Sequence, residues 1–340
     1  MTLAGVGVGL LGDRPVTELV RAAREAEAAG CEGVWVPDER FFRDPYATLA
    51  GIASGTRRVH VGPCVTDPFV RHPALTAMAI GTINEISGGR AVLGMGTGIS
   101  GFSALGITPQ RTLRRMREAI GLIRALLRDG QAEASGELLR FRGRLDFPAQ
   151  PVPVFIAGRG PRVLELAGEI GDGVIIGSLA SPDGLAYAAG RLEAGSRRAG
   201  RNAADLRKMI WLHTYVHDDG QAARASARRI IISVLQSSRE IIGAIGIEIP
   251  PDLARVIDGA PYGYHWNAPD DVLALVPEAL VDAFTAAGTP EDVAEVVNRL
   301  HASGVHHVAF RLWASRGQTP ADVQRLVLAR VLPLLRMVAA

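Results

Sequence analysis

Two adjacent carboxyl groups are the part of this sequence best suited to proton transfer. Asp38 and Glu39 follow the apolar run Gly33–Val36, which is typical of a buried strand. A carboxyl group in an apolar pocket can have its pKa raised towards neutrality, and such a group serves as a general acid or base. We therefore select Glu39 as the candidate catalytic residue. The alternative is a solvent-facing salt bridge from Glu39 to Arg40 or Arg43.

A glycine-rich turn between a predicted strand and a predicted helix is suited to phosphate binding. Its residues are Ala157, Gly158, Arg159, Gly160 and Pro161. Free backbone N–H groups and the positive end of a helix attract anions, and Arg159 can add a charge-assisted hydrogen bond from near the surface. Gly177 and Ser178, at the end of the next predicted strand, extend this candidate pocket. The alternative is a tight turn without a ligand.

Two other glycine patterns favour a different fold. Patterns of the form G-x-G-x-x-G begin at Gly7 and at Gly96, and both match the fingerprint of an open dinucleotide-binding sheet. The first begins inside a strand instead of after it, and the second lies in the wrong part of such a unit. Neither pattern therefore outweighs the organisation of the whole chain.

Short apolar strands that alternate with helices must position these residues. We predict eight strands near Leu3–Val8, Gly33–Val36, Arg58–Val61, Ala91–Leu93, Val154–Ala157, Val174–Ile176, Lys208–Val216 and His307–Phe310. We predict helices near Val16–Ala29, Tyr46–Ser54, Pro73–Ile86, Gln110–Arg128, Pro161–Ile170, Pro182–Ala199, Gln221–Leu235 and Pro320–Arg336, with another from Pro290. Strands joined through helices run parallel, so this repeat predicts an α/β fold, a closed (β/α)₈ TIM barrel with its functional groups at the carboxyl ends of the strands. The alternative is an open, doubly wound sheet.

Two segments interrupt the repeat, and we interpret both as insertions in a single domain spanning residues 1–340. The first, near residues 130–150, contains a predicted hairpin or flap at Glu137–Phe147. The second, near residues 240–282, is predicted to be irregular and is a candidate lid. Its polar and aromatic residues either line a substrate pocket or hold the insertion against the barrel; they are Tyr262, Tyr264, His265 and Trp266.

Composition excludes several classes of function. The net charge of +2 over 340 residues argues against nucleic acid as the main partner, since a phosphate-binding surface needs a basic excess. The two cysteines, Cys31 and Cys64, form neither a C-x-x-C motif nor a disulfide framework, and no metal site is indicated. The apolar N-terminal run is too short to span a membrane. We expect a cytoplasmic homodimer that acts on a small molecule.

Several blocks of the chain together resemble the bacterial-luciferase-like superfamily, in particular its branch that uses the deazaflavin coenzyme F420. The first block, Arg57–Gly101, contains GPCVTDPFVRHP followed by GRAVLGMGTG. The others are Val34–Asp44, Pro151–Ser178 and Ala287–Phe310. Within them, RGPRVLELAGEIGDG is similar to methylenetetrahydromethanopterin reductases. The resemblance implies a TIM barrel and F420 as the cofactor.

The resemblance also implies roles for individual residues. It places a bulge with a non-proline cis peptide at Cys64–Val65, behind the flavin-like ring, where Cys64 acts through its backbone and not as a nucleophile. It implies cofactor contacts at Asp38 and at the turn Thr97–Gly98. It places the cofactor phosphate at the glycine-rich turn that contains Arg159.

The chain departs from the pattern of these relatives at four positions, one of which is Arg43, where some sugar-oxidising relatives have an aromatic residue. Glu39 replaces a His that often transfers the proton, and Ile99 stands where some relatives have a catalytic Glu. Gly9 stands where methylenetetrahydromethanopterin reductases have a functional Glu. These departures disfavour oxidation of glucose 6-phosphate or of a simple alcohol and leave the substrate open. We expect hydride transfer between F420 and an organic substrate; the alternatives are an FMN-dependent monooxygenase and a non-catalytic flavin-binding barrel.

Overall fold

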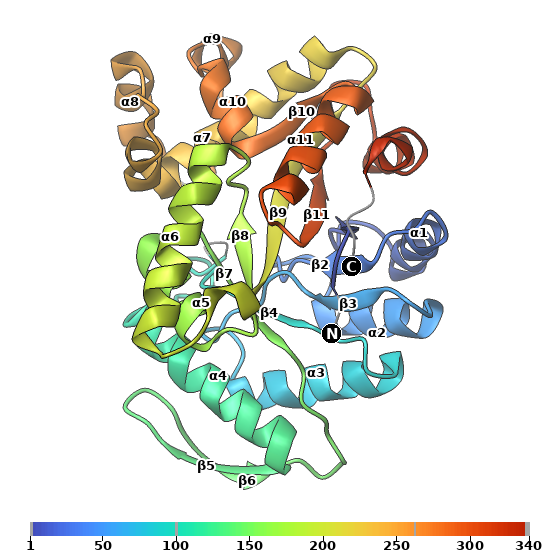
Figure 1. Ribbon diagram of the computed structural model, residues 1–340, viewed down its shortest axis with the longest axis vertical. Helices are drawn as coiled ribbons and strands as arrows, with labels where there is room; N and C mark the ends of the chain where they lie inside the picture. The colour runs from blue at the N-terminus through green and yellow to red at the C-terminus, as the bar shows by residue number, and fades with distance from the viewer. Residues whose placement is uncertain (1–2, 99–100, 262, 337–340) are drawn as a thin grey trace.

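Parallel strands close into a barrel in the computed structural model, which describes residues 3–98, 101–261 and 263–336 (Figure 1). The barrel strands are β1 (Val6–Gly9), β2 (Gly33–Val36), β3 (His60–Pro63), β4 (Leu93–Met95), β7 (Val154–Gly158), β8 (Gly173–Gly177), β9 (Arg207–Val216) and β11 (His307–Leu312). They are hydrogen-bonded in the order β3-β2-β1-β11-β9-β8-β7-β4. Bridges between Val61 and Ala91 and between Thr66 and Met95 join the two ends of this series. The predicted TIM barrel is confirmed, and the open sheet is excluded.

Helices connect the strands, largely at the predicted positions. They are α1 (Val16–Ala28), α2 (Pro45–Gly55), α3 (Pro73–Ser87), α4 (Thr112–Asp129), α5 (Pro161–Ile170), α6 (Pro182–Arg198), α7 (Gly220–Ala244), α11 (Pro290–Ala302) and α12 (Pro320–Leu326), with a short 3-10 turn η1 (Ala203–Asp205) before β9. Several begin with Pro in the first turn, where a missing N–H costs nothing. The Asp44 side chain caps α2, and Thr289 with Asp292 forms a capping box at α11.

The last predicted helix was too long. Helix α12 ends at Leu326 and not at Arg336, and the chain continues through a wider π-helical turn, η3 (Val327–Val331), and a tighter 3-10 turn, η4 (Leu332–Leu334). Pro333 lies in that last turn and has no N–H for the helical ladder, which accounts for the change in winding.

The first predicted insertion is a hairpin, but it begins earlier in the chain than predicted. Strand β5 (Gln131–Ser135) follows directly after Gly130, which ends α4, and pairs antiparallel with β6 (Arg140–Arg144). The turn between the two strands therefore lies at the start of the predicted hairpin segment, Glu137–Phe147. The hairpin lies outside α4, at one end of the molecule (Figure 1).

The second predicted insertion is mostly helical and not irregular. Helix α7 continues beyond Leu235 to Ala244, with a non-helical residue at Ser238. Helices α8 (Pro251–Asp258), α9 (Asp270–Ala274) and α10 (Glu278–Phe284) and the 3-10 turn η2 (Tyr264–Trp266) follow it. These helices gather at the end of the molecule opposite the hairpin (Figure 1).

A strand that the sequence analysis missed follows this segment. Strand β10 (Thr285–Gly288) runs parallel to the carboxyl-terminal half of β9, with Thr285 opposite His213. Its sequence, TAAG, lacks the large β-branched residues by which the other strands were found. Because β10 lies beyond the end of β8 along β9, it extends one wall of the barrel mouth.

The barrel encloses a small inner core, separate from the larger core between strands and helices. Trp35, Phe155 and Met209 belong to this inner core and are fully buried. Both faces of the strands are thus covered, as expected for parallel strands with continuous apolar sequences. At the amino-terminal end, the Trp35 indole N–H donates to His307 Nε2 (3.0 Å), and His307 Nδ1–H donates to the Ala4 carbonyl (2.7 Å).

Candidate functional site

The predicted site residues all lie at the carboxyl ends of barrel strands. Asp38 and Glu39 follow β2, Cys64 and Val65 follow β3, and Thr97 and Gly98 follow β4. The glycine-rich turn spans the end of β7 and the start of α5, and Ser178 follows β8. In a barrel these positions face one mouth, which is where ligands of this fold bind.

Asp38 belongs to a partly buried charged network at this mouth. Arg40 donates to Asp38 Oδ1 (3.0 Å) and also pairs with Asp67, while Thr66 Oγ1 donates to Asp38 Oδ2 (2.7 Å). Each carboxylate oxygen has two lone pairs, so Asp38 can accept one further hydrogen bond at each oxygen. The network fixes the position of this carboxylate beside the β3 bulge.

Glu39 has no such partners. The salt bridge considered as its alternative role does not form, because Arg40 pairs with Asp38 and Asp67 and Arg43 donates to the Gly12 carbonyl (3.0 Å). Among the described residues, the half-buried Glu39 side chain forms no hydrogen bond and no ion pair. It acts instead as the strongest acidic influence on the buried Arg311 guanidinium.

The bulge after β3 has the predicted geometry, with a cis peptide bond between Cys64 and Val65. Two backbone hydrogen bonds join Thr66 to the β4 strand: Thr66 N donates to the Gly94 carbonyl (3.0 Å), and the Thr66 carbonyl accepts from Gly96 N (2.9 Å). A Cβ at Gly94 would collide with the Pro63 carbonyl, so only glycine allows this approach.

Cys64 is not available as a nucleophile in this structure. Its side chain is buried, and burial raises the pKa of the thiol well above the neutral range. The neutral thiol is a poor nucleophile, because the thiolate is the reactive form. The expectation that Cys64 contributes its backbone agrees with this environment.

The turn after β4 lies beside the charged network. Thr97 is half-buried, and Gly98 is exposed with a φ of 57°. The nearest side chains to Gly98 are Phe102 and Asp67. Ile99 lies outside the described residues.

The start of α5 offers free hydrogen-bond donors. Its N-cap residue, Gly160, has no side chain to cap the helix, so the first amide groups have no side-chain partner. Arg159 is half-buried, and its Nη1 atom is fully buried with no partner among the described residues. Burial lowers the pKa of Arg159 to about 10, which still leaves it charged at neutral pH. It is therefore less exposed than the sequence suggested, and it is a cation without a counter-ion.

Ser178 and Gly177 differ in what they offer to a ligand. The Ser178 hydroxyl donates to the Trp211 carbonyl (2.6 Å) and lies 3.3 Å from the His213 amide, so it ties β8 to β9. Gly177 lies beneath the Arg159 side chain, because a Cβ there would be 3.8 Å from Arg159 Nε. The Ser178 hydroxyl is thus already used within the barrel, whereas Gly177 leaves room for Arg159.

Inward-facing residues of β9 and β11 also lie at this mouth, and they were not predicted from the sequence. His213 and Arg311 are opposite each other across these strands. The pKa of His213 is lowered well below its usual range, first by burial and then by the charges of Arg159 and Arg311. The run HVAFRL could have indicated Arg311, because it places a charged residue inside an apolar strand with no acidic residue next to it in sequence.

Trp211 occupies the space beside Gly9. A Cβ at Gly9 would lie 2.8 Å from Trp211 Cζ3, closer than van der Waals contact allows. The position that carries a functional Glu in the reductases named above therefore has neither the carboxyl group nor the room for one. Gly9 therefore offers no side chain for proton transfer, and Glu39, which follows another strand, stays the candidate.

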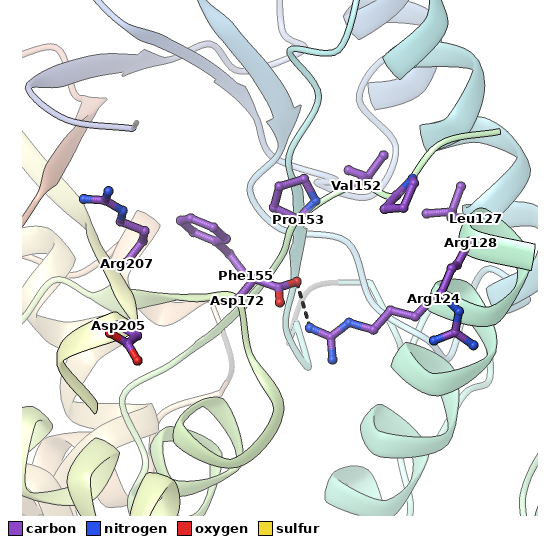
Figure 2. Close-up of a pocket in the computed structure, with 10 residues that line it drawn as sticks. Arg124, Leu127, Arg128, Val152, Pro153, Phe155, Asp172, Asp205 and Arg207 are labelled. Atoms are coloured by element: carbon purple, nitrogen blue, oxygen red, sulfur yellow. Dashed lines mark hydrogen bonds and ion pairs between the residues drawn. The ribbon is translucent and has the colours of Figure 1, made fainter. Parts of the chain in front are cut away.

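Two of the cavities that lie outside the predicted cofactor contacts bear on the site. One, of about 490 Å³, is lined by residues that include Arg124, Phe155, Asp172 and Arg207, at the amino-terminal ends of β7–β9 and thus opposite the predicted site (Figure 2). The other, of about 710 Å³, is lined in part by Trp313 of the barrel mouth.

Residues of the helical insertion contribute to the second cavity. His265 and Trp266 line it together with Tyr215 and Trp313, and the Trp266 ring also contacts the Trp313 ring of the barrel. Tyr264 instead packs against the large core, and Tyr262 lies outside the described residues. In the part of the chain that the structure describes, no group of three metal-ligating side chains occurs, and no helix is long and apolar enough to cross a bilayer.

Comparison with known proteins gives a family and several relatives. The sequence model of the family described as luciferase-like monooxygenase matches residues 1–307. The chain is 34% identical over 307 residues to 5,10-methylenetetrahydromethanopterin reductase of Archaeoglobus fulgidus, covering 89% of this chain and 91% of that protein. It is 36% identical over 246 residues to F420-dependent hydroxymycolic acid dehydrogenase of Mycobacterium tuberculosis, covering 65% and 66%.

The solved structures include a closely similar fold. Coenzyme F420-dependent tetrahydromethanopterin reductase from Methanopyrus kandleri superposes with a TM-score of 0.82 at 25% sequence identity, covering 98% of this chain and 99% of that one. The two folds therefore agree over almost the whole length of both chains.

Proposed function

We propose that this chain, which belongs to the luciferase-like monooxygenase family, is an F420-dependent oxidoreductase that transfers a hydride between the deazaflavin and an organic substrate. The relatives named above support the F420-dependent branch. The observation that carries the proposal in this chain is Arg159, a half-buried cation whose buried Nη1 atom has no partner among the described residues, beside uncapped amides of α5. A phosphate group would supply the missing negative charge.

The residues at the mouth fit F420 in three places. Arg159 and the first amides of α5 would hold its phosphate, and the bulge at Cys64–Val65 would support its ring. Asp38, held by Arg40 and Thr66, would accept a hydrogen bond from it. When bound, F420 supplies a carrier for one hydride, so the protein has to provide position and a route for the proton.

Glu39 is proposed to provide that proton route. Its side chain is half-buried at the mouth and engages no other described residue. The neighbouring Asp38 is held in place by Arg40 and Thr66, so the two adjacent carboxyl groups have different roles. Asp38 orients a ligand, and Glu39 is left to give or take a proton at the substrate.

We also propose that the protein is a cytoplasmic homodimer. Both cysteines are unpaired, as in a reducing compartment. On α3, the apolar side chains of Leu75, Met78 and Ile86 are 49%, 45% and 39% exposed and follow helical spacing. A row of exposed apolar residues on one helix is suited to burial against a second copy.

A binding titration tests the cofactor proposal. Purified protein is titrated with F420 and, separately, with FMN, followed by fluorescence. We expect F420 to bind much more tightly than FMN. Arg159→Met should weaken F420 binding by roughly 10–100-fold, the scale of one charge-assisted hydrogen bond. Arg162→Met, one residue into α5, is the matched control and should bind F420 as the wild type does.

Two outcomes would contradict this proposal. Tight binding of FMN with no response to F420 would favour the monooxygenase alternative. Equal affinity of the wild type and Arg159→Met for F420 would show that the phosphate is bound elsewhere or by backbone amides alone.

A further inference from the structure

A second buried cation lies at the barrel mouth, and the cofactor proposal does not use it. Arg311, on β11, is 9% exposed. Among the described residues it has no acidic side chain within 4.0 Å and no side-chain hydrogen bond; its partner is the Trp313 ring, whose centroid lies 4.5 Å from the guanidinium carbon. A buried guanidinium without an anion is costly, since it loses hydration without replacing it.

The acidic residues around Arg311 do not neutralise it. Glu39 and Asp13 influence its pKa, but neither forms an ion pair with it. Asp13 lies 3.6 Å from Arg14, and Asp38 is already paired with Arg40. An arginine remains protonated even when burial lowers its pKa, so Arg311 keeps its charge. An anion from outside the chain would complete this site.

His213 places a hydrogen-bond donor beside Arg311. The two residues are register partners on β9 and β11, so their side chains leave the sheet on the same face. The Trp313 indole N–H donates to His213 Nδ1 (2.9 Å), so the neutral imidazole carries its proton on Nε2. Arg311 and His213 thus offer a charged fork and a neutral N–H to the same space.

An aromatic wall continues from this donor pair. The Trp313 and Tyr215 rings are stacked, with 6.3 Å between their centroids and an interplanar angle of 10°. The centroid of the Trp266 ring lies 5.8 Å from that of Trp313. All three line the cavity of about 710 Å³. Apolar and aromatic surfaces of this kind bind the body of a small molecule, while a few polar groups fix its orientation.

The cavity itself disfavours an anionic group more than the Arg311 site does. Asp270 is among its lining residues, and Arg229 already donates to the carbonyls of His265, Trp266 and Ala268. The other lining arginine, Arg316, is exposed, so water already solvates its charge. A ligand with one acidic end would therefore direct that end towards Arg311 and its apolar part towards Trp313.

The geometry points to a substrate that carries an acidic group, a carboxylate or a phosphate, on an aromatic or apolar body, with the acidic group bound by Arg311 and His213 and the body packed against Trp313. This inference rests on the proposed function, since the substrate of an F420-dependent oxidoreductase would have to share this mouth with the cofactor. Under this inference the two arginines bind different ligands: Arg159 binds the cofactor, and Arg311 binds the substrate.

Simple probes test this inference without knowledge of the substrate. Benzoate and its neutral analogue benzamide are titrated calorimetrically into the protein, with and without saturating F420, and phenyl phosphate is the second anionic probe. We expect benzoate or phenyl phosphate to bind at least tenfold more tightly than benzamide. Arg311→Met should abolish that preference and leave F420 affinity unchanged within about threefold. Arg316→Met, an exposed arginine at the same cavity, should keep the preference.

The outcomes separate this inference from the cofactor proposal. If F420 fails to bind, the cofactor proposal is wrong, while the probe titrations of the cofactor-free protein still decide the role of Arg311. Equal binding of benzoate and benzamide, or no binding of either anion, overturns the inference. So does a loss of preference in Arg316→Met instead, or competition between F420 and benzoate, which would assign Arg311 to the cofactor.

Protein stability provides a second readout of the same site. Since Arg311 is buried without an anion, Arg311→Met should melt at the same temperature as the wild type or higher when no ligand is bound. Benzoate should raise the melting temperature of the wild type and not that of the variant. A variant that is much less stable without ligand would show that Arg311 holds the fold together through Trp313, which overturns the inference.

Discussion

His307 makes the stability of the protein depend on pH in a way that one substitution can isolate. Its imidazole is fully buried inside the barrel, accepts from the Trp35 indole through Nε2 and donates to the Ala4 carbonyl through Nδ1. Both nitrogens are therefore used by the neutral ring. Burial lowers the pKa of His307 from 6.5 to about 3.

The sign and size of the effect follow from this shift. The unfolded chain binds this proton below about pH 6.5, and the folded chain binds it only near pH 3. The free energy of unfolding therefore falls as the pH decreases through that window, by about 1.4 kcal/mol per pH unit. Between about pH 7.5 and pH 4.5, His307 alone should cost the fold ~3 kcal/mol.

The assay is urea unfolding of the wild type and of His307→Gln at a series of pH values. Glutamine supplies a donor and an acceptor but does not titrate, so the variant is expected to be less stable at neutral pH and less sensitive to acid. The stability advantage of the wild type should shrink by ~3 kcal/mol between about pH 7.5 and pH 4.5. Other buried imidazoles, such as His213, titrate in both chains and cancel in the difference. A constant difference across this range would refute the reasoning.

Three further predictions concern the mouth and the surface. Glu39→Gln should keep F420 affinity but reduce turnover by about 10²–10⁴-fold and remove one limb of the pH–rate profile, and full activity would return Glu39 to a structural role. Gly9→Ala should lower the stability to urea by about 1–3 kcal/mol through its contact with the Trp211 ring. Trp211→Phe should recover part of that loss in the double variant, and simple additivity would rule out the contact. Met78→Glu should shift the protein from dimer to monomer in sedimentation experiments, with Glu85→Gln on the same helix as the control; an unchanged dimer would move the interface elsewhere.

Local sequence signals were enough to predict the barrel strands and most of the helices. Runs such as Gly33–Val36 are short, apolar and buried on both faces, and Pro or a capping side chain marks the start of α2 and α11. Strand β10 was missed because its small residues carry no β-branched signal and its pairing with β9 is a tertiary effect. Helix α7 was also predicted too short. Its last turns pack against the other helices of the insertion, and that tertiary packing is not visible in the local sequence.

The candidate site could be predicted only in part. The resemblance located the cis peptide at Cys64–Val65, which the structure contains, and the strand ends at which the remaining predicted residues lie. It did not indicate Arg311 or His213, because their importance depends on register across β9 and β11 and on the lack of a nearby acid. Whether a charged side chain has a partner is a property of the folded chain and cannot be read from its neighbours in sequence.

Native mass spectrometry tests the central claim most directly. The protein is produced in a host that makes both F420 and FMN, purified without added cofactor and weighed under non-denaturing conditions, with Arg159→Met beside it. We expect a bound mass equal to that of F420 on the wild type and much lower occupancy on the variant. A wild-type protein that retains FMN and no F420 would contradict it.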